Sequence, residues 1–280
     1  MTRGLVITAD DLGREPATTE TIAALLADGY ASATTLITVS PAAEYAAQRM
    51  TQIGVLPHLH VTLTSERGLP RWPAMSGASS ITDPDGSLTD DPFALASRGT
   101  PDDVLREADT QLQWMQQRGL SPVTADSHSG TLYGLHGGPW AEKLLAVALR
   151  WCARHGLAFR LPRDPAPYFG SALPAPLARL HEYAIALADE LGVALPQTIV
   201  TNRRSASELG SYERLRDDCL KRLSTLPEGT SELFLHPSHE DAATGPEHIV
   251  RVWETRLLRD RVWHAALAVE GVRVVAGWPA

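Results

Sequence analysis

Leu5-Val6-Ile7-Thr8-Ala9-Asp10-Asp11-Leu12-Gly13 is the stretch that decides the fold of this 280-residue chain. Its apolar, β-branched beginning predicts a buried strand of a parallel sheet that is covered on both faces. Asp10 and Asp11 at the end of the strand repel each other when they are buried together, unless a cation or a shared proton relieves the repulsion. The strand end therefore suits a cation, provided that other strand ends supply further ligands.

Short apolar segments and longer amphipathic segments alternate along the rest of the chain. The later strand-like segments are 31–39, 53–63, 123–126, 158–161, 197–201, 232–235 and 272–275. The helix-like segments are 18–28, 41–50, 101–118, 139–155, 173–191, 207–223 and 246–268. Because parallel strands need helical crossovers, seven or eight such units predict an α/β fold, an irregular (β/α) TIM-like barrel with mostly parallel strands. We expect a single domain that spans residues 1–280.

The segment from residue 64 to residue 100 interrupts this alternation. It is polar, contains Gly, Pro and Ser throughout, and is too long for an ordinary connection. We interpret it as a loop insertion that forms either a lid or part of an active site.

The composition argues against some classes of partner. With 33 acidic and 25 basic residues, the formal net charge is −8, which argues against a nucleic acid or an anionic membrane as partner. The chain shows neither a signal-like first segment nor a stretch of about 18 apolar residues. Cys152 and Cys219 have no CxxC partner, which fits a reducing compartment. We expect a cytoplasmic protein, and a homodimer stays open.

Residue types that bind metals stand at four of the predicted strand ends. They are Asp10, Asp11, His58, His60, Asp126, His128 and His236. In a barrel, the carboxyl ends of the strands meet at one face, which is where active sites lie. Two imidazoles and one carboxylate with open positions suit Zn²⁺, and also Mn²⁺, Fe²⁺ or Co²⁺, whereas Mg²⁺ prefers more oxygen ligands. The pattern predicts a divalent metal site that leaves room for a water and a substrate oxygen.

Each of these residues also has a simpler interpretation. An Asp at a strand end can cap the following helix or pair with Arg14. Only one of His58 and His60 need be a ligand, and the two share a face of a regular strand. Asp126 can support an imidazole through a hydrogen bond, and His236 can be held extended by the proline that follows it. Their joint position at one barrel face favours the catalytic interpretation.

Four segments together resemble the signatures of the YdjC-like carbohydrate deacetylases, also called the ChbG family. The segments are 9–13 (ADDLG), 60–66 (HVTLTSE), 126–128 (DSH) and 232–237 (ELFLHP), which are similar in order to ADDxG, HLxLT, DSH and ExxxHP. The resemblance covers nearly the whole chain. It implies an irregular (β/α) barrel, a divalent metal ion, and removal of an N-acetyl group from an amino sugar or a small N-acetylated oligosaccharide.

The resemblance also implies a role for each matched residue. The metal ligands would be Asp11, His60 and His128. Asp10 would be the general base, and His236 would be the general acid or the group that stabilises the tetrahedral intermediate. Arg160 resembles a site arginine that holds a carboxylate in place. The metal would be Zn²⁺ or Mg²⁺, with Mn²⁺, Fe²⁺ and Co²⁺ as alternatives.

Two positions depart from the family pattern. Gly130 stands where many members have a second histidine, and Ser238 stands where many have a glycine after the HP pair. We therefore expect this chain to differ from other members in its substrate pocket, where Trp72 of the 64–100 segment could stack on a sugar ring. Two other functions stay open: a metal-dependent hydrolase of another amide or ester bond, and a non-catalytic carbohydrate-binding barrel.

Overall fold

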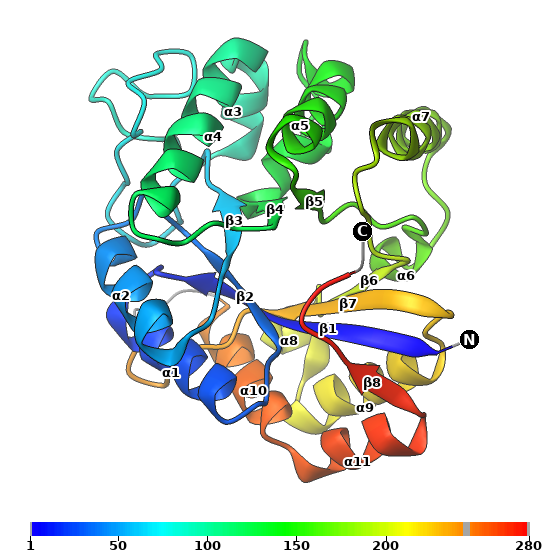
Figure 1. Ribbon diagram of the computed structural model, residues 1–280. Helices are drawn as coiled ribbons and strands as arrows, with labels where there is room; N and C mark the ends of the chain where they lie inside the picture. Colours follow the sequence, from blue (N-terminus) through cyan, green and yellow to red (C-terminus); the bar gives the residue numbers. More distant parts are fainter. Residues whose placement is uncertain (1, 243–246, 279–280) are drawn as a thin grey trace.

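The computed structural model describes residues 2–242 and 247–278, and it contains a curled parallel sheet surrounded by helices (Figure 1). The strands are β1 (Arg3–Leu12), β2 (Ala33–Leu36), β3 (His58–Val61), β4 (Thr124–Ser127), β5 (Ala158–Phe159), β6 (Ile199–Val200), β7 (Gly229–Leu235) and β8 (Val272–Val274). The helices are α1 (Pro16–Ala27), α2 (Ala43–Ile53), α3 (Pro92–Arg98), α4 (Pro101–Gln116), the 3₁₀ helix η1 (His128–Tyr133), α5 (Ala141–His155), α6 (Ala166–Phe169), α7 (Ala175–Leu191), α8 (Ala206–Leu209), α9 (Tyr212–Ser224), α10 (His248–Leu258) and α11 (Arg261–Val269).

The sheet is a half-barrel of parallel strands. Its order is β5-β4-β3-β2-β1-β7-β6, and β8 pairs with the first residues of β1. The two ends of this order approach each other, because Asp164 and Thr198 form a parallel bridge beyond β5 and before β6. The predicted α/β fold with an irregular TIM-like barrel is confirmed. The carboxyl ends of β1, β3, β4 and β7 therefore open on the same side.

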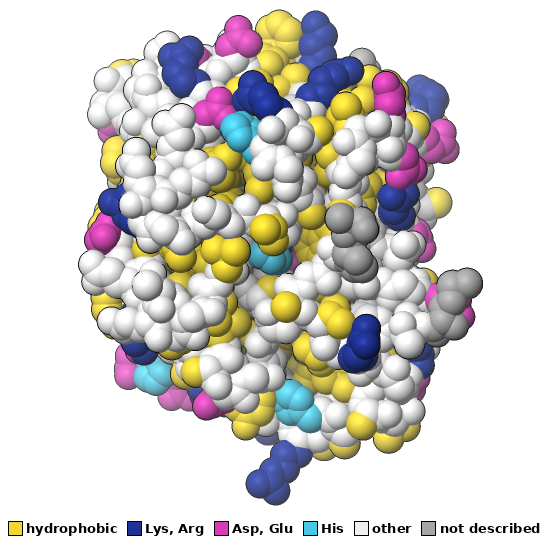
Figure 2. Space-filling model, in the orientation of Figure 1, with side chains coloured by type: hydrophobic (Ala, Val, Ile, Leu, Met, Phe, Trp, Pro, Cys, Tyr) yellow, Lys and Arg dark blue, Asp and Glu magenta, His cyan; other side chains and the backbone are white. Residues whose placement is uncertain are grey.

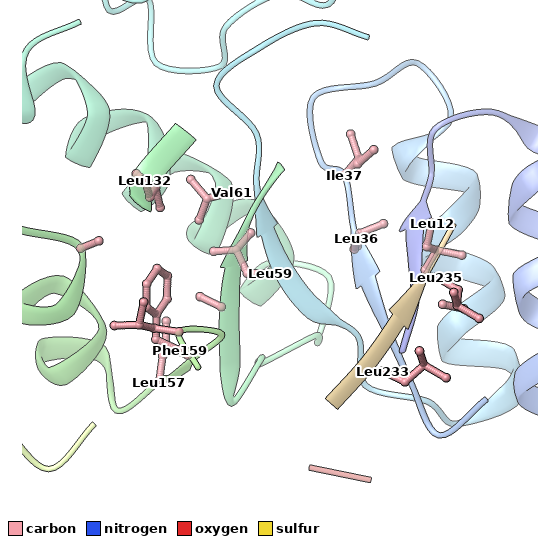
Figure 3. Close-up of a cluster of buried hydrophobic side chains, with 14 of the residues drawn as sticks. Leu12, Leu36, Ile37, Leu59, Val61, Leu132, Leu157, Phe159, Leu233 and Leu235 are labelled. Atoms are coloured by element: carbon pink, nitrogen blue, oxygen red, sulfur yellow. The ribbon is translucent and has the colours of Figure 1, made fainter. Parts of the chain in front are cut away.

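The core lies on both faces of the strands, as expected for a parallel sheet between helices. Leu12, Leu36 and Leu59 come from β1, β2 and β3 and are fully buried (Figure 3). They are paired across the sheet, with Leu36 opposite both Leu12 and Leu59. On the outer face shown in Figure 2, Lys and Arg side chains are scattered among Asp and Glu.

A β-bulge interrupts β1 at the paired acids. Ala9 lies opposite Thr34 and Leu12 lies opposite Leu36, so that two residues of β1 face one residue of β2. In a regular strand, adjacent side chains point to opposite faces, but a bulge can redirect one of them. Asp11 has φ 70°, a left-handed conformation that Asp adopts more readily than most residues. As a result, Asp10 and Asp11 both line the same cavity.

Two of the predicted helices are divided in the structure. The segment 246–268 forms α10 and α11, because the side chain of Asp260 accepts a hydrogen bond from Val262 N at 2.8 Å and caps a new helix; residue 246 lies outside the described residues. The segment 207–223 likewise divides between α8 and α9, where the Ser211 side chain caps α9. Capping side chains favour a helix start over continuation of the preceding helix.

Buried side chains of α4 anchor the 64–100 segment. The carboxylate of Glu107, which is fully buried, accepts hydrogen bonds from Met75 N at 3.0 Å and Ser76 N at 2.8 Å. Asp103, one turn earlier, accepts a hydrogen bond from Ser80 N at 2.9 Å. These bonds to buried carboxylates hold the segment against the barrel. The segment also contains the short helix α3, which the sequence pattern did not predict.

Candidate metal centre

Three predicted ligands converge at the carboxyl ends of β1, β3 and β4. His60 Nε2 lies 3.3 Å from His128 Nδ1 and 3.4 Å from Asp11 Oδ1, and His128 Nδ1 lies 3.7 Å from the same oxygen. All three side chains are buried. One carboxylate oxygen and two imidazole nitrogens that face a common point are a suitable donor set for a divalent first-row metal ion. The residues present therefore fit the metal that the sequence pattern predicts.

Asp126 orients the imidazole of His60. Both carboxylate oxygens of Asp126 lie 2.9 Å from His60 Nδ1, so this nitrogen donates a hydrogen bond to Asp126 and Nε2 faces Asp11. His58 behaves differently. Its ring packs edge-on against Trp278, with 5.8 Å between ring centroids, and burial lowers the pKa of His58 to about 4. The structure thus brings His60, rather than His58, to the other two predicted ligands.

The carboxylates around His60 create a site for positive charge. Burial alone would lower the pKa of His60, but the charge of Asp126 and the contacts to Asp11 and Asp126 raise it to about 10. A group of buried acids that attracts a proton so strongly also attracts a metal cation. The local electrostatics therefore agree with the donor set.

Arg160 holds the second acid of the pair. Its Nη1 lies 2.7 Å from Asp10 Oδ2 and its Nη2 lies 2.9 Å from Asp10 Oδ1, a two-point contact between buried groups. The same guanidinium lies 2.6 Å from Asp126 Oδ2 and 2.8 Å from Glu232 Oε1. The group Asp10, His60 and Asp126 also has donor atoms close enough for a cation. Arg160 already supplies positive charge between the carboxylates of Asp10 and Asp126. The cluster of Asp11, His60 and His128 therefore suits a metal better.

Arg251 is a site residue that the sequence pattern missed. Its Nη1 lies 2.7 Å from Asp11 Oδ2. Burial alone would raise the pKa of Asp11, but Arg251, His128 and His60 hold it well below its usual value. Arg251 lies in a helix and not at a predicted strand end. The signal that could have indicated it as a site residue is its position as a basic residue on the buried side of α10, one residue after buried Val250.

Glu66 completes the surroundings of His128. Glu66 belongs to the 60–66 motif, and its Oε2 lies 3.5 Å from His128 Nε2. Its other oxygen lies 3.7 Å from Arg14 Nη2 and 3.6 Å from Arg251 Nη2. Arg14 thus pairs with Glu66, and also with Glu15, rather than with the acids at the end of β1. The interpretation of those acids as partners of Arg14 is wrong.

His236 reaches the same cavity from the end of β7. Its side chain is 33% exposed, and its backbone N donates a hydrogen bond to Glu254 Oε2 at 2.7 Å. Its Nδ1 lies 4.0 Å from the same oxygen. Glu254 therefore fixes the backbone that carries His236, while the imidazole stays accessible from the cavity.

Trp72 does not line the cavity as a stacking surface. Only 1% of this residue is exposed, and its ring centroid lies 6.0 Å from that of His128 in a tilted arrangement. The prediction that Trp72 could stack on a sugar ring is wrong, because the anchored 64–100 segment buries the ring. His181, in α7, also lines the cavity.

The cavity is about 330 Å³ in volume and is lined by all six predicted site residues. They are Asp10, Asp11, His60, His128, Arg160 and His236. Arg251 and Glu66 stand beside them. A buried cluster of carboxylates, imidazoles and arginines at the carboxyl ends of parallel strands is a typical enzyme site of a (β/α) barrel.

Fold and site together define an α/β barrel protein with a candidate metal centre. The chain belongs to the YdjC-like protein family, whose model matches residues 4–269. It is 26% identical over 299 residues to a carbohydrate deacetylase of Mus musculus, an alignment that covers 97% of this chain and 93% of the mouse chain.

Solved structures share the fold. One is a candidate cellobiose-phosphate cleavage protein from Enterococcus faecalis, with a TM-score of 0.76, 20% identity, and coverage of 98% of this chain and 97% of that chain. Another is a lactam utilization protein from Thermus thermophilus, with a TM-score of 0.51, 14% identity, and coverage of 98% of this chain and 100% of that chain. Among the described residues, no helix is long and apolar enough to cross a membrane.

Proposed function

We propose that this protein is a metal-dependent carbohydrate deacetylase, which hydrolyses the N-acetyl group of an amino sugar or a small N-acetylated oligosaccharide. Membership of the YdjC-like family and the name of the mouse relative support the reaction class. The observation that carries the proposal is the convergence of Asp11, His60 and His128 beside a second acid, Asp10, in one cavity. Buried Cys152 and Cys219 are free thiols and agree with a cytoplasmic location.

The proposed metal ligands are Asp11, His60 and His128. A divalent cation bound there would act as a Lewis acid, lowering the pKa of water and polarising the acetyl carbonyl. The two imidazoles favour Zn²⁺, Mn²⁺, Fe²⁺ or Co²⁺ over Mg²⁺. Asp126 holds His60 in the tautomer that this role requires, and Arg251 fixes the carboxylate of Asp11.

Asp10 is the proposed general base. Both of its oxygens are held by Arg160, and Thr35 Oγ1 donates a hydrogen bond to Oδ1 at 3.1 Å, so that the carboxylate cannot rotate freely. A fixed carboxylate beside the metal ligands can accept a proton from the attacking water. Arg160 thus acts by positioning the base.

His236 is the proposed general acid. The departing amine is a poor leaving group as an anion, so that it must be protonated as the C–N bond breaks. His236 is partly exposed at the cavity and follows β7, whereas Asp10 lies in β1, so the two groups enter the cavity from different strands. In the alternative role, its ring nitrogen would stabilise the oxyanion of the tetrahedral intermediate.

Acetate release from N-acetylglucosamine and N-acetylated chito-oligosaccharides, with and without a chelator, tests the proposal. We expect release by the metal-loaded protein, loss after chelation and recovery after a divalent metal is restored. Release that is unaffected by the chelator contradicts the metal role. If acetate is released from no N-acetylated sugar but another amide or an ester is cleaved, the reaction class is wrong.

A further inference from the structure

The cavity that contains the candidate metal centre has a second, apolar part. Six leucines line it, and we call them the apolar lobe: Leu135, Leu145, Leu161, Leu173, Leu177 and Leu180. We propose that the apolar lobe binds an apolar substituent of the substrate, an alkyl or aryl group joined to the amino sugar. This inference rests on the proposed function and narrows its substrate class.

Helix α7 shows why these side chains face a cavity. In its C-terminal half, Ala184, Leu187 and Ala188 are buried in the core. In its N-terminal half, Leu177 and Leu180 lie at helical spacing on the cavity wall and are only half-buried. The exposed part of these side chains is apolar surface that would gain free energy by contact with an apolar group.

The apolar lobe begins directly beside the candidate metal centre. Ser129 and Gly130, which follow His128, have positive φ values of 53° and 65°, so the chain turns sharply there. A Cβ atom at Gly130, which lines the cavity, would lie 3.8 Å from Leu135 Cδ1. Leu135, the first leucine of the apolar lobe, thus lies next to the turn that follows His128.

The apolar lobe is poorly suited to sugar hydroxyl groups. His181 follows Leu180 on α7, but its Nε2 already donates a hydrogen bond to Pro162 O at 2.7 Å. The two Nη atoms of Arg160 are engaged by three carboxylates. Hydroxyl groups buried here without partners would lose their hydrogen bonds to water, which is costly.

A second hollow, with charged residues in its lining, adjoins the site and suits the sugar better. It is about 410 Å³ in volume and is lined by charged residues that include Arg14, Arg67 and Asp90. It shares Glu66 and Arg251 with the first cavity, so the two adjoin at the candidate metal centre. The sugar ring would thus bind toward the second hollow, where charged side chains offer hydrogen bonds, and its apolar substituent would enter the apolar lobe.

Two series of ligands test the inference and locate the substituent. The first series is methyl, butyl, hexyl and octyl β-glucosides, which carry no N-acyl group, and the second is methyl glucosaminide with N-acetyl, N-butanoyl and N-hexanoyl groups. Binding to the metal-loaded protein is measured by calorimetry below the micelle concentration. We expect Kd to fall about fourfold for each added methylene in one series, since each buried CH₂ contributes a similar transfer free energy. A Kd independent of chain length in both series overturns the inference.

The binding readout separates this inference from the proposed function. Chain-length dependence without any hydrolysis supports the apolar lobe and contradicts the deacetylase. Acetate release without chain-length dependence supports the deacetylase and overturns the apolar lobe.

Two leucine variants and one control variant on α7 test whether the apolar substituent binds at the apolar lobe. Leu177→Asn and, separately, Leu180→Asn should weaken binding of the longest effective ligand about tenfold and leave the methyl ligand unchanged. Tyr183→Asn is the control, because Tyr183 is 51% exposed on the same helix and outside the cavity lining. Thermal unfolding verifies that each variant is folded. If both leucine variants keep the chain-length dependence of the wild type, the inference is wrong.

Discussion

Both carboxylate oxygens of Asp126 lie 2.9 Å from Nδ1 of His60, which leaves His60 Nε2 facing Asp11. Asp126→Asn should keep the shape of this contact and lose its charge. We expect metal affinity to fall about 10- to 100-fold, the usual effect of removing such a supporting contact. Competition with a chromophoric chelator measures it. Asp189→Asn, at an exposed ion pair with Arg163, is the control and should bind metal as the wild type does.

The proposed ligands predict which of two neighbouring histidines matters. His60→Ala and Asp11→Ala should each abolish stoichiometric metal binding, because two remaining donors hold a divalent ion weakly. His58→Ala should retain the metal and lose only stability, since it removes a buried core ring. Metal content after dialysis, with circular dichroism to verify folding, gives the result. Full metal content in His60→Ala would exclude the proposed site.

The proposed base predicts a separation of metal binding from turnover. Asp10→Asn should keep the metal and the contact to Arg160, but lower kcat by about 100-fold or more, because an amide cannot accept the proton of the water. Steady-state kinetics and metal analysis of the same preparation test this. A variant with wild-type kcat would rule out Asp10 as the base.

The raised pKa of Glu232 leads us to expect that this residue makes a pH-dependent contribution to the free energy of unfolding. Burial, opposed by Arg160 and Thr8, raises the pKa of Glu232 from 4.5 to about 7. Between these values the folded protein binds more protons than the unfolded chain, so this residue lowers stability as the pH rises. Glu232→Gln cannot ionise, and its free energy of unfolding should increase relative to the wild type by at most roughly 3 kcal/mol from about pH 5 to about pH 8.

Denaturant titrations of the wild type and Glu232→Gln at the two pH values supply the measurement. The sign is decisive, because a raised pKa in the folded state requires the difference between the two proteins to grow toward high pH. A difference that stays constant, or shrinks, would show that Glu232 is ionised in the folded protein throughout this range.

Local sequence patterns were sufficient to predict the fold class and to predict that the site residues lie close together. Alternating apolar and amphipathic segments require parallel strands joined by helices. Since the carboxyl ends of parallel strands meet at one face, residues as distant as Asp11 and His128 could be expected to approach. The family resemblance, which the family model confirms, then distinguished His60 from His58.

Other features depend on contacts between distant parts of the chain. Arg251 lies 240 residues from Asp11, and nothing local marks it as that acid's partner. Trp72 sits in a polar segment, yet the anchoring of this segment on α4 buries the ring. Neither outcome follows from local composition, because each depends on which surfaces pack together.

The sequence by itself thus determined a parallel α/β barrel with acids and imidazoles at its strand ends, because strand and helix periodicity are local properties of the chain. Only the tertiary structure decided that a bulge directs the side chains of Asp10 and Asp11 toward the same cavity. It also decided that Arg160 pairs with Asp10 and Arg251 with Asp11. It also placed six leucines in the lining of that cavity. The physical reason is that side-chain direction and charge pairing at a buried site are set by long-range packing.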